Sequence, residues 1–125
     1  MKLLLAVALG GAVGAVARWS SVGLLTRWLG TGFPYGILMV NVTGSFLMGV
    51  VVEYLSARAG ASTELRGFLV VGVLGAFTTF SSFAFDVRAL LERDEIVLAM
   101  LYVTASVVVS VLALFAGIAV VRSLS

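Results

Sequence analysis

Hydroxyl and phenyl side chains gather in one apolar stretch of this sequence, residues 72–85. The stretch reads GVLGAFTTFSSFAF and holds four hydroxyl residues within five positions as well as four phenylalanines. Apolar residues flank it on both sides, which places it at the depth of a membrane. Hydroxyl groups and the positive edges of phenyl rings can contact an anion without the strong binding that a lysine would impose. The alternative interpretation is a helix–helix contact rich in Ser, Thr and Gly.

The same stretch predicts a helix that is interrupted near its middle. Thr78 and Thr79 are β-branched, and their hydroxyls can compete for backbone hydrogen bonds, so both form helix less readily than Ala or Leu. Gly75 lowers the helix propensity further. Irregular backbone inside a bilayer is tolerated only where protein covers it or water reaches it, and broken helices at mid-depth recur in ion sites.

Two other polar side chains lie inside apolar stretches. Asn41 and Ser45 are four residues apart and share a helix face. Because an unpaired amide in lipid is costly, Asn41 either hydrogen-bonds a neighbouring helix or donates to a permeating anion. Arg18 is the only charge well inside the first stretch. It either extends to the interface or lines a polar vestibule and attracts an anion.

The last apolar stretch carries a stripe of hydroxyls. Tyr102, Ser106 and Ser110 follow one another at intervals of four residues. The stripe provides either interhelical hydrogen bonds or a ladder of neutral donors along a narrow path. Phe80 and Phe83 share a face if a helix resumes after the interruption, and simple packing is the alternative for them.

These residues are carried by an all-α integral membrane protein of one domain, residues 1–125. Of the 125 residues 62% are hydrophobic and 11% are charged, whereas soluble domains carry about 25% charged residues. Four segments exceed the roughly 20 residues that cross a bilayer: residues 3–29, 33–57, 65–91 and 96–121. An even number of spans places both termini on one side.

Composition excludes several functions and leaves the orientation open. The chain has no cysteine and no histidine, which removes disulfides, thiolate metal sites and the usual general base. An enzyme is therefore not expected, and a net charge of +2 does not indicate nucleic acid.

The basic residues divide four against four between the two sides if Arg18 is counted on the second: Lys2, Arg58, Arg66 and Arg122 against Arg18, Arg27, Arg88 and Arg93. Without an excess on one side, both orientations can insert, and an antiparallel homodimer becomes possible.

Three of the four segments carry a motif set that resembles the Fluc (CrcB) family of fluoride channels. The matching residues are GGAVGAVAR at 10–18, PYGILMVNVTGSF at 34–46 and GVLGAFTTFSSF at 72–83. The specific part is Asn-x-x-Gly-Ser-Phe followed by Gly-x-Phe-Thr-Thr-Phe-Ser-Ser-Phe. Ala76 stands where the family often has a second glycine.

The resemblance implies an antiparallel, dual-topology homodimer with two pores in the cell inner membrane, which exports cytoplasmic fluoride by passive flow. Phe80 and Phe83 correspond to the family's aromatic box, and Asn41 corresponds to its pore asparagine. Gly75 and Thr78 correspond to positions whose backbone carbonyls hold a structural Na⁺ at the dimer centre.

The remaining predicted pathway residues belong to the polar groups already described. Tyr102 and Ser110 resemble the family's polar track. Thr79, Ser82 and Arg18 complete the predicted fluoride pathway.

Two other functions compete with a channel. A small multidrug exporter also forms antiparallel dimers, but a proton-coupled exporter needs an intramembrane carboxylate, and no acid lies near the centre of any segment. A membrane assembly subunit would explain the glycines but not the cluster of Phe, Ser and Thr.

Overall fold

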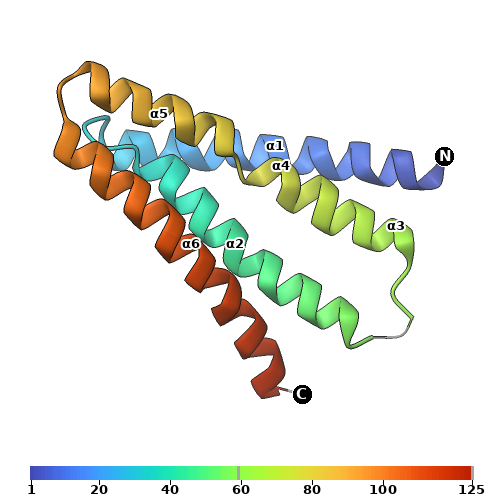
Figure 1. Ribbon diagram of the computed structural model, residues 1–125. Coiled ribbons are helices and arrows are strands. Elements are labelled where there is room, and N and C mark those ends of the chain that lie inside the picture. Colours follow the sequence, from blue (N-terminus) through green and yellow to red (C-terminus); the bar gives the residue numbers. More distant parts are fainter. Residues whose placement is uncertain (59, 125) are drawn as a thin grey trace.

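The computed structural model describes residues 1–58 and 60–124 and consists of helices that form four spans (Figure 1). The elements are α1 (Lys2–Leu29), α2 (Tyr35–Ser56), α3 (Thr63–Arg66), η1 (Gly67–Leu74), α4 (Gly75–Phe77), α5 (Phe80–Glu92) and α6 (Ile96–Leu124). Together α3, η1, α4 and α5 form the third span, Thr63–Glu92. All four spans are long and apolar enough to cross a membrane. The prediction of four spans is therefore confirmed, while Ala59, in the predicted loop after the second span, lies outside the described residues.

The third span is interrupted halfway along its length. Thr78 has φ −89° and ψ 155°, and Thr79 has φ −153° and ψ 121°, so both residues are extended. These two residues, hereafter the break, separate α4 from α5 and confirm the predicted interruption. The eight residues of η1 before the break form a π-helix, a rare conformation that is found frequently at functional sites and that we did not predict.

Two pairs of helices make the most extensive contacts, α2 with α6 and α1 with η1. The first pair crosses closely because glycine stands on both helices. A Cβ atom on Gly49 would collide with the carbonyl oxygen of Leu114, and one on Gly117 would collide with that of Phe46. Small residues at a crossing allow this approach of two backbones within a membrane.

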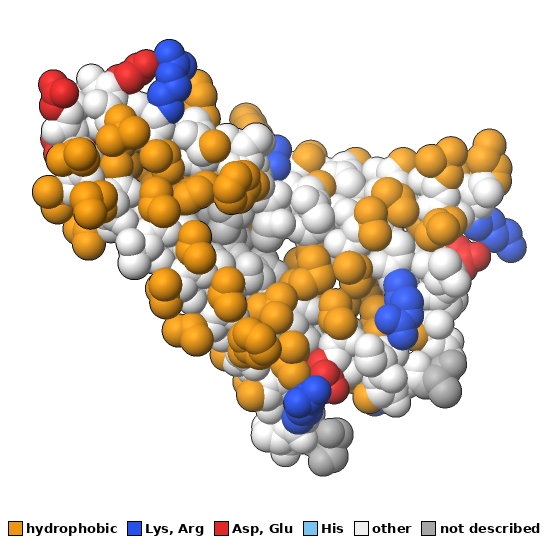
Figure 2. All heavy atoms as spheres, in the orientation of Figure 1, with side chains coloured by type: hydrophobic (Ala, Val, Ile, Leu, Met, Phe, Trp, Pro, Cys, Tyr) orange, Lys and Arg blue, Asp and Glu red, His pale blue; other side chains and the backbone are white. Residues whose placement is uncertain are grey.

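The two ends of the molecule are distinct. Both termini and the connection from α2 to α3 lie at one end, and the connections from α1 to α2 and from α5 to α6 lie at the other (Figure 1). Most charged side chains on the face shown in Figure 2 lie toward these ends, and hydrophobic side chains cover the region between them. Glu53 pairs with Arg122 at 3.4 Å at the end that holds the termini. This distribution agrees with a protein that spans a membrane.

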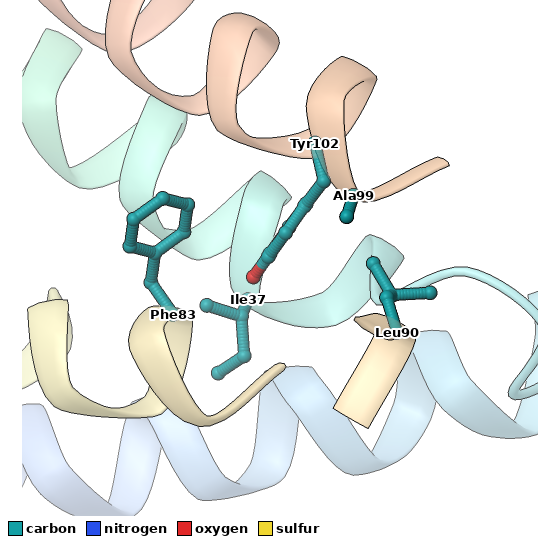
Figure 3. Packing of buried hydrophobic residues seen from close by; sticks show 5 residues of the cluster. All are labelled: Ile37, Phe83, Leu90, Ala99 and Tyr102. Atoms are coloured by element: carbon teal, nitrogen blue, oxygen red, sulfur yellow. The ribbon is translucent and has the colours of Figure 1, made fainter. Parts of the chain in front are cut away.

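A small hydrophobic core joins α2, α5 and α6 on the far side of the break from the termini (Figure 3). Tyr102 is 0% exposed, and its ring points from α6 toward α5 among Phe83, Ile37 and Leu90. This core holds α5 against α2 and α6.

Candidate functional site

A cavity of about 320 Å³ lies beside the break, between α2, α5 and α6. Hydroxyl, amide, phenyl and valine side chains line it: Asn41, Ser45, Thr78, Thr79, Phe80, Phe83, Ser106, Val107, Ser110 and Val111. The structure therefore brings together five of the residues predicted for an anion pathway, from three separate sequence segments. Among the described residues, no charged side chain lines this cavity.

The break ends in a capped helix. The Thr79 hydroxyl accepts a hydrogen bond from the backbone N–H of Ser82 at 3.1 Å, which satisfies one of the free N–H groups at the start of α5. Ser82 was predicted to contribute its hydroxyl to the pathway. The structure places this residue outside the cavity lining, and its backbone binds the cap.

Asn41 hydrogen-bonds the break through both polar atoms of its amide. Its Nδ2 donates to the carbonyl oxygen of Thr79 at 3.0 Å, and its Oδ1 accepts from the Thr79 N–H at 2.8 Å. Of the two interpretations of Asn41, the contact with a neighbouring element is the one that the structure shows. One N–H of the amide remains for other contacts, since a primary amide has two.

Arg18 also binds the break, from the side of α1. Its Nη1 donates to the carbonyl oxygen of Ala76, the second-last residue of α4, at 3.1 Å. The guanidinium therefore lies at the depth of the break and does not extend to the end of α1. Because it belongs to neither end, the basic residues now divide four against three.

Phe80 and Phe83 share the cavity-facing side of α5, as predicted, with ring centroids 5.3 Å apart. Their environments differ. Phe83 is 7% exposed and also contacts the Tyr102 ring at 5.1 Å, whereas Phe80 is 77% exposed in the single chain. Phe80 therefore leaves one side of the cavity open.

Tyr102 lies beyond Phe83 and does not line the cavity. Its hydroxyl donates to Oδ2 of Asp86 at 2.9 Å. Our sequence reasoning did not single out Asp86. The available signal was that Asp86 is the only acid within residues 65–91, and an acid inside an apolar span requires a partner.

The hydroxyl oxygens of Ser106 and Ser110 are buried and have no hydrogen-bond partner among the described residues. Both line the cavity, and Ser106 is only 7% exposed. Ser106 belongs to the predicted hydroxyl stripe, although it was not among the predicted pathway residues. Since buried polar groups normally have partners, these two hydroxyls are available to hydrogen-bond a polar species in the cavity.

The predicted cation ligands are the carbonyl groups of Gly75, in α4, and of Thr78, at the break. The hydroxyl and the N–H of Thr78 both donate to the Leu74 carbonyl, at 3.0 and 3.1 Å. Among the hydrogen bonds found outside the regular helices of the described chain, none ends on the carbonyl oxygens of Gly75 and Thr78. These oxygens are hard donors of the kind that bind alkali and alkaline-earth cations.

Fold and cavity together define a multi-pass membrane protein with a polar, uncharged site at the middle of its third span. Residues 5–118 match the family model described as CrcB-like protein, Camphor Resistance (CrcB), and the chain belongs to this family.

Curated relatives match over nearly the whole chain. A protein of Rhizobium meliloti (strain 1021) named "Fluoride-specific ion channel FluC" is 48% identical over 124 residues, 99% of each chain. Proteins of the same name from Rhodospirillum centenum (strain ATCC 51521 / SW) and Agrobacterium fabrum (strain C58 / ATCC 33970) are 53% and 51% identical, over 98% and 94% of each chain.

Proposed function

We propose that this chain is a fluoride-selective ion channel of the cell inner membrane, through which cytoplasmic fluoride leaves by passive flow. The observation that carries the proposal is the cavity at the break, where the buried hydroxyls of Ser106 and Ser110 have no partner among the described residues. The names of the relatives support the choice of ion.

The chemistry of the cavity favours fluoride over larger anions. Fluoride is small and strongly hydrated, so only close hydrogen-bond donors can replace its water. The serine hydroxyls and the edges of Phe80 and Phe83 provide such contacts without a cationic side chain that would trap the ion. The uncharged lining also favours passive flow, because proton-coupled transport uses a carboxylate on the pathway.

Efflux from liposomes tests this function. The purified chain should release fluoride from loaded vesicles much faster than chloride at equal ion gradients, with no proton gradient applied. Equal release of the two anions would overturn the assignment. Release that requires a proton gradient would favour an exporter, and the absence of any release would favour an assembly subunit.

The working unit that we propose is an antiparallel homodimer. A second copy would cover the exposed Phe80 ring and close the open side of the cavity, which a single chain leaves incomplete. Four basic residues against three give little bias toward one orientation.

Because the chain has no cysteine, a single cysteine added at the C-terminus can be labelled from one face of sealed vesicles. About half of the thiols should react before permeabilisation, and labelling of all or none would contradict dual topology.

A structural Na⁺ at the centre of this dimer is part of the proposal. The carbonyl oxygens of Gly75 and Thr78 fit a hard monovalent cation, since none of the hydrogen bonds found outside the regular helices of the described chain ends on them. Bound there, the ion would be a partner for carbonyl groups that are costly to leave unpaired in a membrane. The melting temperature of the purified protein should rise with Na⁺ and not with a large organic cation at the same ionic strength. An equal response to both cations would count against the site.

A further inference from the structure

We propose that Asn41 is a positioning residue that acts through the backbone of Thr79. By binding the N–H and the carbonyl oxygen of this residue it fixes the start of α5, and with it the Phe80 ring, at the cavity. The inference rests on the proposed channel function only where flux is the measurement.

The geometry at Thr79 is that of a missing backbone partner. Because the residue is extended, its N–H does not reach the helical acceptor that a continuous helix would provide. Asn41 offers a donor and an acceptor side by side, and both are used, at 3.0 and 2.8 Å. A primary amide can bind both the N–H and the carbonyl oxygen of one extended residue in this way, whereas a carboxylate cannot donate and a hydroxyl is too short to bind both atoms.

Neighbouring contacts hold the rest of the break. Arg18 of α1 binds the Ala76 carbonyl at 3.1 Å on the α4 side. Gly44, almost one turn after Asn41 on α2, leaves room for the Thr78 methyl group, which a Cβ atom at this position would contact. The break is therefore held from two helices, and Asn41 fixes the residue from which α5 begins.

The competing role for Asn41 is direct donation to the ion by its remaining N–H. The two roles differ in their coupling to Thr79. If Asn41 acts through Thr79, removing the Thr79 N–H and removing Asn41 damage the same contact, and the two effects do not multiply. If Asn41 binds the ion directly, the two effects are independent and multiply.

An amide-to-ester substitution at Thr79, which installs the corresponding α-hydroxy acid, removes the N–H and leaves the side chain unchanged. We expect Asn41→Ala and the Thr79 ester each to lower fluoride efflux at least about tenfold, a barrier change of roughly 1.4 kcal/mol. The combination should be no slower than the slower single variant. The matched control is Asn41→Ala combined with Ser110→Ala. In this pair the two reductions in fluoride efflux should multiply. Multiplying effects of Asn41→Ala and the ester, or an ester with wild-type efflux, would overturn the inference. The ester also weakens the Thr78 carbonyl. Because an effect of that origin would be independent of Asn41, a combined effect that does not multiply can come only from the contact that Asn41 and Thr79 share.

Hydrogen exchange tests the same contact without reference to flux. In Asn41→Ala, amides 79–82 should exchange faster, while amides 67–74 of η1 keep their wild-type protection and the melting temperature changes little. Unchanged exchange at residues 79–82 would overturn the positioning role even if the protein passes no fluoride. Wild-type vesicles that release no fluoride would overturn the proposed function alone. A variant that does not purify as a folded species would be replaced by Asn41→Ser, for which the same exchange pattern is expected.

Discussion

The two halves of the third span are attached to the molecule in different ways. The half before the break, η1 and α4, packs its backbone directly against α1, where a Cβ atom on Gly72 would lie 2.8 Å from the Cα of Gly10. The half after the break, α5, meets the other helices through large side chains such as Phe83 and Leu90 and makes far fewer contacts with them. Only the second half presents side chains to the cavity beyond the break.

The two halves therefore have different roles. Where the backbone of η1 packs directly against that of α1, there is no room for an added side chain, so the half before the break is a fixed support. The position of α5 depends instead on a few specific contacts, namely Asn41 with Thr79 at its start and Tyr102 with Asp86 farther along. We therefore expect substitutions before the break to alter stability and substitutions after it to alter flux.

The largest effect on flux should come from the phenyl rings. Phe80→Ile keeps an apolar side chain but removes the positive ring edge, which is worth about 0.5–1.5 kcal/mol in ring contacts and more in a narrow pore. Fluoride efflux should fall at least about tenfold while the protein still purifies as the same species. Phe83→Ile should lower efflux similarly and also reduce the melting temperature, because Phe83 belongs to the core with Tyr102. Wild-type efflux in both variants would show that the rings serve packing alone.

Substitutions in the half before the break, η1 and α4, or in the part of α1 that packs against it, should change the stability of the protein. A Cβ atom on Gly10 would collide with the Phe68 carbonyl oxygen, whereas one on Gly11 would meet nothing within 4 Å. Gly10→Ala should therefore destabilise the protein by about 1–3 kcal/mol, as overpacking does. Gly11→Ala, its matched control on the same helix, should be neutral or stabilise by up to about 1 kcal/mol, since alanine favours helix. Thermal unfolding in detergent measures both. Equal melting temperatures for the two variants would remove the contrast between the halves.

The sequence was informative where the signal is local. Four apolar lengths, the low helix propensity of Thr78 and Thr79, and the spacing of Phe80 and Phe83 each depend on neighbours in the chain, and the structure confirms all three. The partners of polar side chains depend on which helices touch, which composition does not reveal. Asn41 and Arg18 were correctly identified as unusual, but their carbonyl and N–H partners at the break could not be predicted. The π-helix was not predicted for a related reason, because its wider hydrogen bonding has no side-chain signature; it lies where the third span contacts α1.

The smallest effect on flux should come from Asp86, although it is an acid within a span. Its carboxylate accepts the Tyr102 hydroxyl at 2.9 Å and lies outside the cavity lining. Asp86→Asn keeps an oxygen acceptor for that hydroxyl, so a passive channel should retain fluoride efflux within about twofold, a change of less than half a kcal/mol in barrier. Asp86→Ala removes the acceptor and leaves a buried hydroxyl unpaired, which should lower stability by about 1–3 kcal/mol.

Efflux with and without a proton gradient, together with thermal unfolding, distinguishes a structural role of Asp86 from a role in transport when both variants are measured. If Asp86→Asn abolished efflux while its melting temperature stayed at the wild-type value, the carboxylate would take part in transport. A coupled exporter would then replace the passive channel.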